Sequence, residues 1–141
     1  MAIQIFVNLP VKDLPKSIQF FTQLGYKFDA RFTNDQATCM IIDENIYIML
    51  LVESFFKTFT PKQISDAKKQ TEVLMGLSVE SRAKVDEIIG QAVSAGAKTP
   101  VPTQDHGFMY ERSFEDLDGH IWAYFHMEPG AVPSEQLAET V

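Results

Sequence analysis

The feature that most constrains the fold of this chain is a hydrophobic pattern that occurs twice in its 141 residues. In the first half, aliphatic residues alternate with other residues over positions 3–9, which predicts a strand with one aliphatic face. Asp13 then suits a helix N-cap, apolar residues follow at helical spacing, and Gly25 predicts the end of that helix. Three further stretches have strand character: residues 26–32, 37–42 and 46–52.

The second half repeats the same order of elements. Residues 72–79 alternate, Ser81 suits an N-cap, and a helical apolar stripe ends at Gly96. Three more strands are predicted, a short one near residues 98–101 and a hairpin formed by residues 108–114 and 121–127. Each half is therefore expected to be a strand, a helix and three strands.

A module of this size cannot bury its sheet alone, so we expect the two to form one α+β domain over residues 1–127. The predicted architecture is two βαβββ modules in a curved, mostly antiparallel, cup-shaped sheet with the helices outside. The alternative is an unrelated α+β fold in which the repeat is coincidental. The expected parts are module one (1–53), a connector (54–71), module two (72–127) and a surface tail (128–141).

Composition excludes several classes of protein. Twelve Lys and Arg against 19 Asp and Glu give a net charge of -7, which argues against binding to nucleic acid or to an anionic membrane. One Cys and three His exclude a disulfide framework and a Cys-rich zinc site. Cys39 lies in an apolar stretch, which predicts an inert thiol in a reducing, cytoplasmic setting. No apolar stretch approaches the roughly 20 residues that cross a bilayer.

The connector is aromatic. Phe55, Phe56 and Phe59 lie close together in residues 54–70. We expect a connecting helix that packs on the core or forms a homodimer contact, and the alternatives are a lid or an interaction module for another partner.

Two motifs and the double module resemble a known superfamily. The opening motif at residues 6–14 reads FVNLPVKDL, and the closing motif at residues 116–122 reads DLDGHIW. Together they resemble the glyoxalase/bleomycin resistance/dioxygenase (vicinal oxygen chelate) superfamily, and residues 105–122 look like an uncharacterised glyoxalase-like bacterial branch of it. The resemblance implies a cup that, in metal-dependent members, holds a divalent ion through His, Glu or Gln side chains on the first and last strands of each module.

Carried onto this chain, the four ligand positions implied by the resemblance are Phe6, Met49, Leu74 and Ala123. Three of these side chains have no donor atom, and a thioether suits only soft metals. We therefore expect no cofactor and no catalytic metal. A register slip could bring in Glu53 or Glu72, but two carboxylates do not complete an ordinary site.

Alternation along the strands predicts that Phe6, Asn8, Met49, Leu74 and Ala123 face the cup. Arg112, from the polar stretch 106–112, joins them as an expected ligand-binding residue. A mostly apolar wall with a few polar groups suits a small amphipathic molecule. The alternative is that Phe6, Met49 and Leu74 simply fill the space as core.

Two functions follow from these residues. The first is a metal-free protein of the glyoxalase/bleomycin resistance type that binds a small molecule. The alternative is a lyase, isomerase or dioxygenase-like enzyme in which Glu72 is the base and His106 or Tyr110 is the acid. Arg112, near the same loop, could hold a carboxylate or phosphate, or could simply form an ion pair on an exposed strand.

Overall fold

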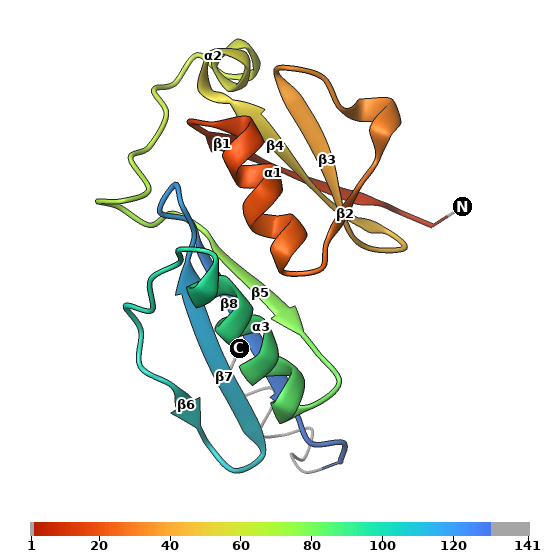
Figure 1. Ribbon diagram of the computed structural model, residues 1–141, viewed down its shortest axis with the longest axis vertical. Helices are drawn as coiled ribbons and strands as arrows, with labels where there is room; N and C mark the ends of the chain where they lie inside the picture. Colours follow the sequence, from red (N-terminus) through yellow and green to blue (C-terminus); the bar gives the residue numbers. More distant parts are fainter. Residues whose placement is uncertain (1, 131–141) are drawn as a thin grey trace. The chain divides into compact units, whose positions relative to one another are not determined.

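The computed structural model describes residues 2–130, which form two compact units (Figure 1). The first comprises residues 2–72 together with Leu117–Gly119, and the second comprises Val73–Asp116 together with residues 120–130. Each unit is built on one four-stranded sheet. The predicted α+β class and the repeated order of strand, helix and three strands are confirmed.

The first unit has the strand order β1-β4-β3-β2. Strand β1 (Ile5–Val11) is parallel to β4 (Ile46–Val52), whereas β3 (Ala37–Asp43) is antiparallel to both β4 and the short β2 (Lys27–Phe28). Helix α1 (Leu14–Gln23) connects β1 to β2 and lies across one face of this sheet (Figure 1).

Local sequence explains where α1 begins and what it covers. The carboxylate of Asp13 accepts the N–H of Lys16 at 3.1 Å, so the first turn has the side-chain cap that the sequence predicts. Phe20 and Phe21 on the helix are buried together with Leu9 and Leu50 from the sheet. Leu9 and Val11 of the first strand's aliphatic face are therefore core, whereas Ile3 and Ile5 remain exposed.

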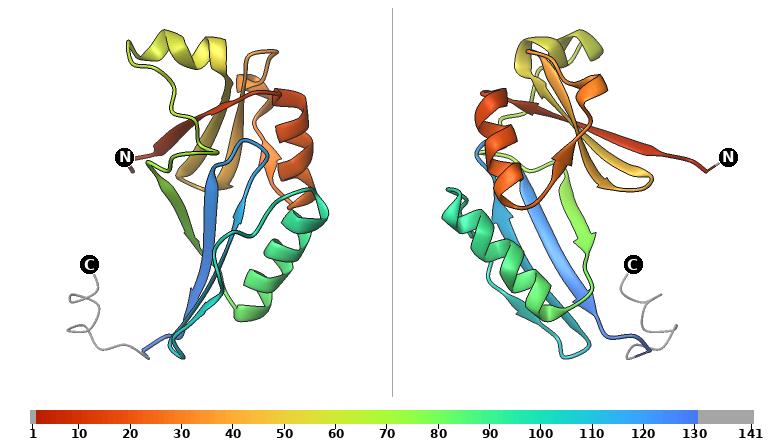
Figure 2. Two further views of the ribbon diagram at one scale, coloured as in Figure 1. Left: turned by 90° about the vertical axis from the view of Figure 1, so that its left-hand side faces the viewer. Right: turned by 45° about the vertical axis from the view of Figure 1, so that its right-hand side comes forward.

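The second unit repeats this topology with the strand order β5-β8-β7-β6. Its parallel pair consists of β5 (Leu74–Ser78) and β8 (Ile121–Met127), and β7 (Met109–Glu115) is antiparallel to both β8 and β6 (Gln104–Asp105). Helix α3 (Arg82–Ser94) covers one face of the sheet (Figure 2). Ser81 caps it by accepting the N–H of Lys84 at 3.0 Å.

Aromatic side chains fill the core of the second unit. The rings of Phe114, Trp122 and Tyr124 are fully buried, and Phe114 is stacked on both of the others. The Nε1–H of Trp122 donates to the buried carboxylate of Asp116 at 2.9 Å, and the same carboxylate accepts the N–H of His120 at 3.0 Å. The hydrogen bonds therefore compensate for burial of a charged group beside the aromatic core.

Three predicted elements are wrong in extent. Only Lys27–Phe28 of the strand predicted at 26–32 is extended, because Asp29 caps a 3-10 turn, η1 (Ala30–Phe32), by accepting the N–H of Arg31 at 3.0 Å. Near 98–101 there is a single bridge between Lys98 and Glu115, since two prolines in this stretch, Pro100 and Pro102, have no N–H to donate.

The connector also differs from the expected helix. It contains only α2 (Glu53–Phe56) and η2 (Lys57–Phe59), followed by a turn at residues 67–69. No helix within residues 2–130 is both long and apolar enough to cross a membrane. Most of the predicted surface tail, residues 131–141, lies outside the described residues.

The turn at Leu117–Gly119 belongs to the first unit and is held there by specific contacts. The carboxylate of Asp118 accepts the N–H of Lys12 at 2.9 Å and the hydroxyl of Ser17 at 3.4 Å. Gly119 has a φ of +95°, and an added Cβ would lie 2.6 Å from the backbone nitrogen of Lys68. This position therefore requires glycine for two reasons, its backbone conformation and its close contact.

We expect Trp122→Phe to lower the free energy of unfolding by about 2–3 kcal/mol, because it creates a cavity and removes a hydrogen bond to a buried carboxylate. Urea titration followed by circular dichroism measures this loss. The control is Phe59→Leu at a side chain that is 67% exposed, where we expect a change within about 0.5 kcal/mol. Equal effects of the two substitutions would contradict the prediction.

Substitution of Gly119 by alanine tests the close contact. Gly107 is the matched control, because its φ is +81° but nothing lies within 4 Å of an added Cβ. We expect Gly107→Ala to cost about 1 kcal/mol from backbone strain, and Gly119→Ala to cost at least about 1 kcal/mol more because the backbone must also shift. Melting temperatures that fall equally in both variants would rule out the steric contribution.

Candidate functional site

Each sheet has one face covered by a helix and one face on the opposite side, which we call the open face. Alternation along the strands assigns residues to the two faces. In the first unit, Leu9 and Val11 of β1 are buried towards α1, whereas Phe6 and Asn8 are exposed on the open face. The side chains that could meet a ligand are therefore the exposed ones on the open faces, because Ala37, Cys39 and Leu51 on the open face of the first sheet are buried.

The open face of the first sheet is mainly apolar. Phe6 and Tyr47 are in register on β1 and β4, and their rings are stacked with centroids 4.8 Å apart. Asn8 is in register with Met49, and Met49 is in register with Cys39 on β3. Burial raises the pKa of the Cys39 thiol, so it has the character of an inert core cysteine.

The open face of the second sheet combines apolar, small and acidic side chains. Leu74 is 64% exposed at its edge. Three small residues form a row across the sheet, because Ala123 of β8 is in register with Gly76 of β5 and with Ser113 of β7. The other residues of this face are Ser78, Met109, Glu111, Glu115, Ile121, Phe125 and Met127.

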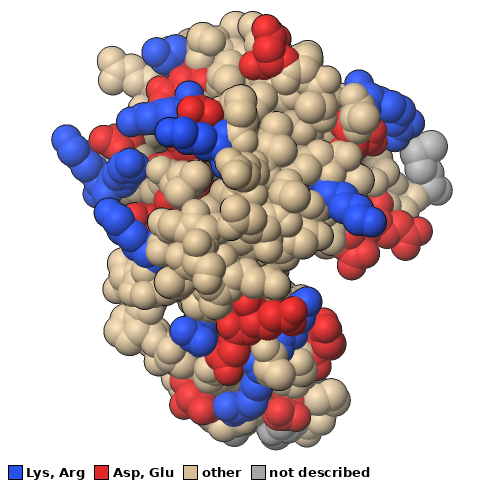
Figure 3. Space-filling model, viewed as in Figure 1, with Lys and Arg blue, Asp and Glu red and all other residues tan. Residues whose placement is uncertain are grey.

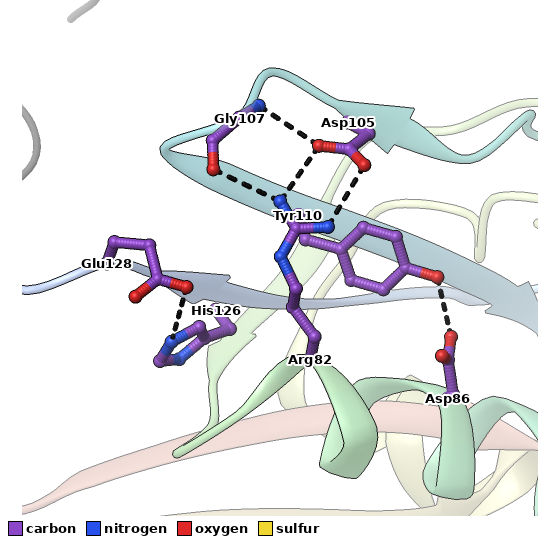
Figure 4. Close-up of polar contacts among 7 residues, drawn as sticks. All are labelled: Arg82, Asp86, Asp105, Gly107, Tyr110, His126 and Glu128. Carbon is purple, nitrogen blue, oxygen red and sulfur yellow. Dashed lines mark hydrogen bonds and ion pairs between the residues drawn. The ribbon is translucent and has the colours of Figure 1, made fainter.

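The helix side of the same sheet carries a polar cluster, which Figure 4 shows. The guanidinium of Arg82 donates to both carboxylate oxygens of Asp105, at 3.0 and 2.9 Å, and to the carbonyl of Gly107 at 3.1 Å. It also lies over the ring of Tyr110, 4.9 Å from its centroid. This arrangement fixes the loop between β6 and β7 to the first turn of α3.

A second carboxylate completes the polar cluster. Asp86 of α3 accepts the hydroxyl of Tyr110 at 2.6 Å and Arg112 Nη1 at 2.8 Å. Nearby, one ring nitrogen of His126 contacts the carbonyl of Val79 at 3.0 Å. The donors and acceptors of this cluster are therefore largely paired with one another.

The pairing sets the ionisation of the cluster. The hydrogen bonds from Arg82, followed by the N–H of Gly107, lower the pKa of Asp105 to about 2. The hydroxyl of Tyr110, followed by Arg112, lowers the pKa of Asp86, and the same hydrogen bond raises the pKa of Tyr110. Both carboxylates are therefore charged and engaged at neutral pH, which makes the cluster a structural clamp rather than a free acid or base.

The predicted ligand-binding residues fall on both kinds of face. Phe6, Asn8 and Met49 lie on the open face of the first sheet, and Leu74 and Ala123 lie on the open face of the second. Arg112 is the exception, because it lies on the helix side and pairs with Asp86. The surface ion pair, one of the two alternatives for Arg112, is the arrangement in the structure.

The candidate catalytic residues do not form a donor and acceptor pair. Tyr110 points towards α3 and donates to Asp86, so it does not contribute to the open face. His106 is exposed in the turn before β7, with its ring 6.2 Å from that of Phe108. Glu72 is exposed before β5 and belongs to the first unit.

The residues present do not fit the divalent metal centre that the resemblance implies. Phe6, Leu74 and Ala123 have no donor atom, and Met49 has only its thioether. Over residues 2–130, no group of three or more His, Cys, Asp or Glu side chains is placed to hold a metal ion. Glu53 begins α2 and Glu72 precedes β5, so neither belongs to the strand on which a register slip would use it.

The polar side chains that β7 places on the open face were not predicted from the sequence. Glu111, Ser113 and Glu115 alternate along β7, and Ser113 Oγ is buried without a hydrogen-bond partner in the described part of the chain. The alternation in residues 109–115 could have revealed that these three side chains share a face. On the face of the molecule that Figure 3 shows, acidic and basic side chains are interspersed.

Comparisons with known proteins agree with the fold. The family model described as bleomycin resistance protein-like N-terminal matches residues 4–42, which include β1, α1 and most of β3. Among curated proteins, no sequence matches this chain.

Solved structures match over almost the whole chain. The hypothetical protein SA1046 from S. aureus is 26% identical with a TM-score of 0.76, over 89% of this chain and 95% of that one. A glyoxalase/bleomycin resistance protein/dioxygenase family enzyme from Burkholderia phytofirmans PsJN is 14% identical with a TM-score of 0.75, over 89% and 99% of the two chains. A glyoxalase-related enzyme from Fulvimarina pelagi is 16% identical with a TM-score of 0.75, over 89% and 88%.

The N-terminal match and these structural similarities agree with the repeated module and with the two motifs in the sequence. Over residues 4–42 the chain is similar to bleomycin resistance protein-like N-terminal domains, and its fold is that of solved glyoxalase/bleomycin resistance/dioxygenase proteins.

Proposed function

We propose that this protein binds a small amphipathic molecule on the open faces of its sheets and does so without a metal. The observation that carries the proposal is the replacement of all four implied ligand positions by Phe6, Met49, Leu74 and Ala123. Apolar side chains at these positions supply a binding surface instead of a coordination site.

Exposure supports the same function. Phe6 is 47% exposed and Leu74 is 64% exposed. When a ligand covers a large, accessible apolar side chain, it removes that surface from water, and this makes the free energy of binding more favourable. A polar neighbour would orient the polar end of the molecule, either Asn8 on the first sheet or Glu111 on the second.

The enzyme alternative has less support. A lyase, isomerase or dioxygenase-like reaction through side chains needs a base and an acid that reach one substrate. Tyr110 is bound to Asp86 on the helix side, and Arg112 shares that carboxylate. We further propose a cytoplasmic homodimer as the state in which the protein acts, which analytical ultracentrifugation of the full chain tests.

The test of metal-free binding is a thermal-shift screen of amphipathic compounds with and without EDTA, coupled to elemental analysis of the purified protein. A compound that binds only the native state raises the melting temperature, and we expect that shift to be the same with EDTA. Stoichiometric zinc, nickel or iron, together with loss of the shift in EDTA, would contradict the proposal.

The open face is tested by Leu74→Ala against Ile3→Ala. Ile3 is 90% exposed and precedes β1, so it controls for truncating an exposed aliphatic side chain. We expect Leu74→Ala to weaken binding of a hit from the screen about fivefold, because it removes apolar surface that the ligand would cover. Ile3→Ala should leave the dissociation constant unchanged, and equal effects would place the ligand elsewhere.

A further inference from the structure

We infer that the open face of the second sheet binds a small amphipathic cation, with its protonated amine at Ser113 and Glu111 and its apolar body on the neighbouring side chains of β5 and β8. This inference rests on the proposed function and names the charge of the ligand and the residues that recognise it.

The first step of the argument is the hydroxyl of Ser113. This residue is only 7% exposed, and its Oγ has no hydrogen-bond partner within residues 2–130. A buried hydroxyl without a partner is destabilising, and an alanine would fill the same place without that cost. The stability of the fold therefore does not explain a serine at this position. A ligand that forms a hydrogen bond with the hydroxyl would explain it.

The neighbouring strands cannot satisfy this hydroxyl with their side chains. Ser113 is in register with Ala123, which is itself in register with Gly76. Neither residue has a polar side chain, and the ring of Phe125 approaches within 3.9 Å of the position that a Cβ on Gly76 would take. The row therefore has the ring of Phe125 beside its Gly76 end and a single side-chain hydroxyl, that of Ser113, at its other end.

The second step is the charge around Ser113. Glu111 and Glu115 lie two residues to either side on the same strand and the same face, about 7 Å along β7 from Ser113. Neither forms an ion pair with any described side chain. Lys98 bridges to Glu115 through its backbone, whereas the residue in register with Glu111 is the uncharged Gln104. Glu111 is therefore the better counter-charge.

The basic side chains of this unit leave Glu111 without a counter-charge. Arg82 is paired with Asp105, Lys84 with Glu87 and Arg112 with Asp86. Lys98 is opposite Glu115 and not Glu111. An anionic ligand beside Ser113 would therefore meet the carboxylate of Glu111, and a cationic ligand would be attracted by it. An ammonium also offers the N–H donors that the hydroxyl and carboxylate oxygens can accept.

The third step is the apolar body. Ile121 and Phe125 flank Ala123 on β8 of the open face, and Leu74 is the exposed edge residue of β5. An aromatic or aliphatic group packed on Ala123 would contact these side chains. A cation beside Phe125 would also form a favourable cation–π interaction with its ring. The ligand class is therefore an amine joined by a short linker to an apolar or aromatic group.

The experiment uses the full-length protein and three probes that share one aromatic body. Phenethylamine is cationic, phenethyl alcohol is neutral and phenylacetate is anionic at pH 7. Titrations are followed by backbone amide shifts in nuclear magnetic resonance, which give both the dissociation constant and the face that is contacted. We expect phenethylamine to bind on β7 and β8 and to bind at least about fivefold more tightly than the alcohol, with phenylacetate weakest.

Two substitutions separate recognition from stability. Glu111→Gln should raise the dissociation constant for phenethylamine to about that for the alcohol, whereas the matched control Glu80→Gln, an exposed carboxylate outside the open face, should not change it. Ser113→Ala should weaken phenethylamine binding about tenfold without lowering the melting temperature, because the hydroxyl has no partner in the free protein.

The outcomes distinguish this inference from the proposed function. If the alcohol or phenylacetate binds the same face as tightly as the amine, recognition of a cation is overturned and small-molecule binding stands. If Ser113→Ala lowers the melting temperature and leaves the affinity unchanged, the role of the hydroxyl is overturned. If none of the probes shifts β7 or β8, the inference fails, and the Leu74→Ala comparison decides the proposed function separately.

Discussion

The structure depends on the covering of each four-stranded sheet by a single helix. Burial of Leu9, Val11, Ile48 and Leu50 on the α1 side of the first sheet, and of Phe114, Trp122 and Tyr124 on the α3 side of the second, removes these apolar side chains from water. The opposite face of each sheet does not pack against α1 or α3, so its side chains are not required to form the core between helix and sheet. Exposed Phe6 and Leu74 and the buried hydroxyl of Ser113 lie on these open faces.

Much of this fold could be predicted from the sequence because period-two alternation and helix caps are local signals. Asp13 and Ser81 cap the helices as expected, and the two modules have the same strand order. The errors arose where local chemistry competed with β-propensity. Asp29 turned the end of a predicted strand into a 3-10 turn, and the prolines near residue 100 left only one bridge.

The site could be predicted less well than the fold. Parity placed Phe6, Leu74 and Ala123 on the correct side of their strands, but Arg112 was grouped with them because it belongs to a polar stretch. Its pairing with Asp86, 26 residues earlier, depends on how α3 packs on β7 and leaves no local signal. For the same reason, the missing partner of Ser113 becomes visible only once Ala123 and Gly76 are known to lie beside it.

The core around Trp122 has a practical consequence. This is the single tryptophan of the chain, and it is buried in the second unit against Phe114, with its indole bound to Asp116. Intrinsic tryptophan fluorescence therefore reports on the aromatic core of the second unit, while the first unit contributes no tryptophan signal. A fluorescence transition that departs from the transition seen by circular dichroism would resolve the unfolding of the two units without any added label.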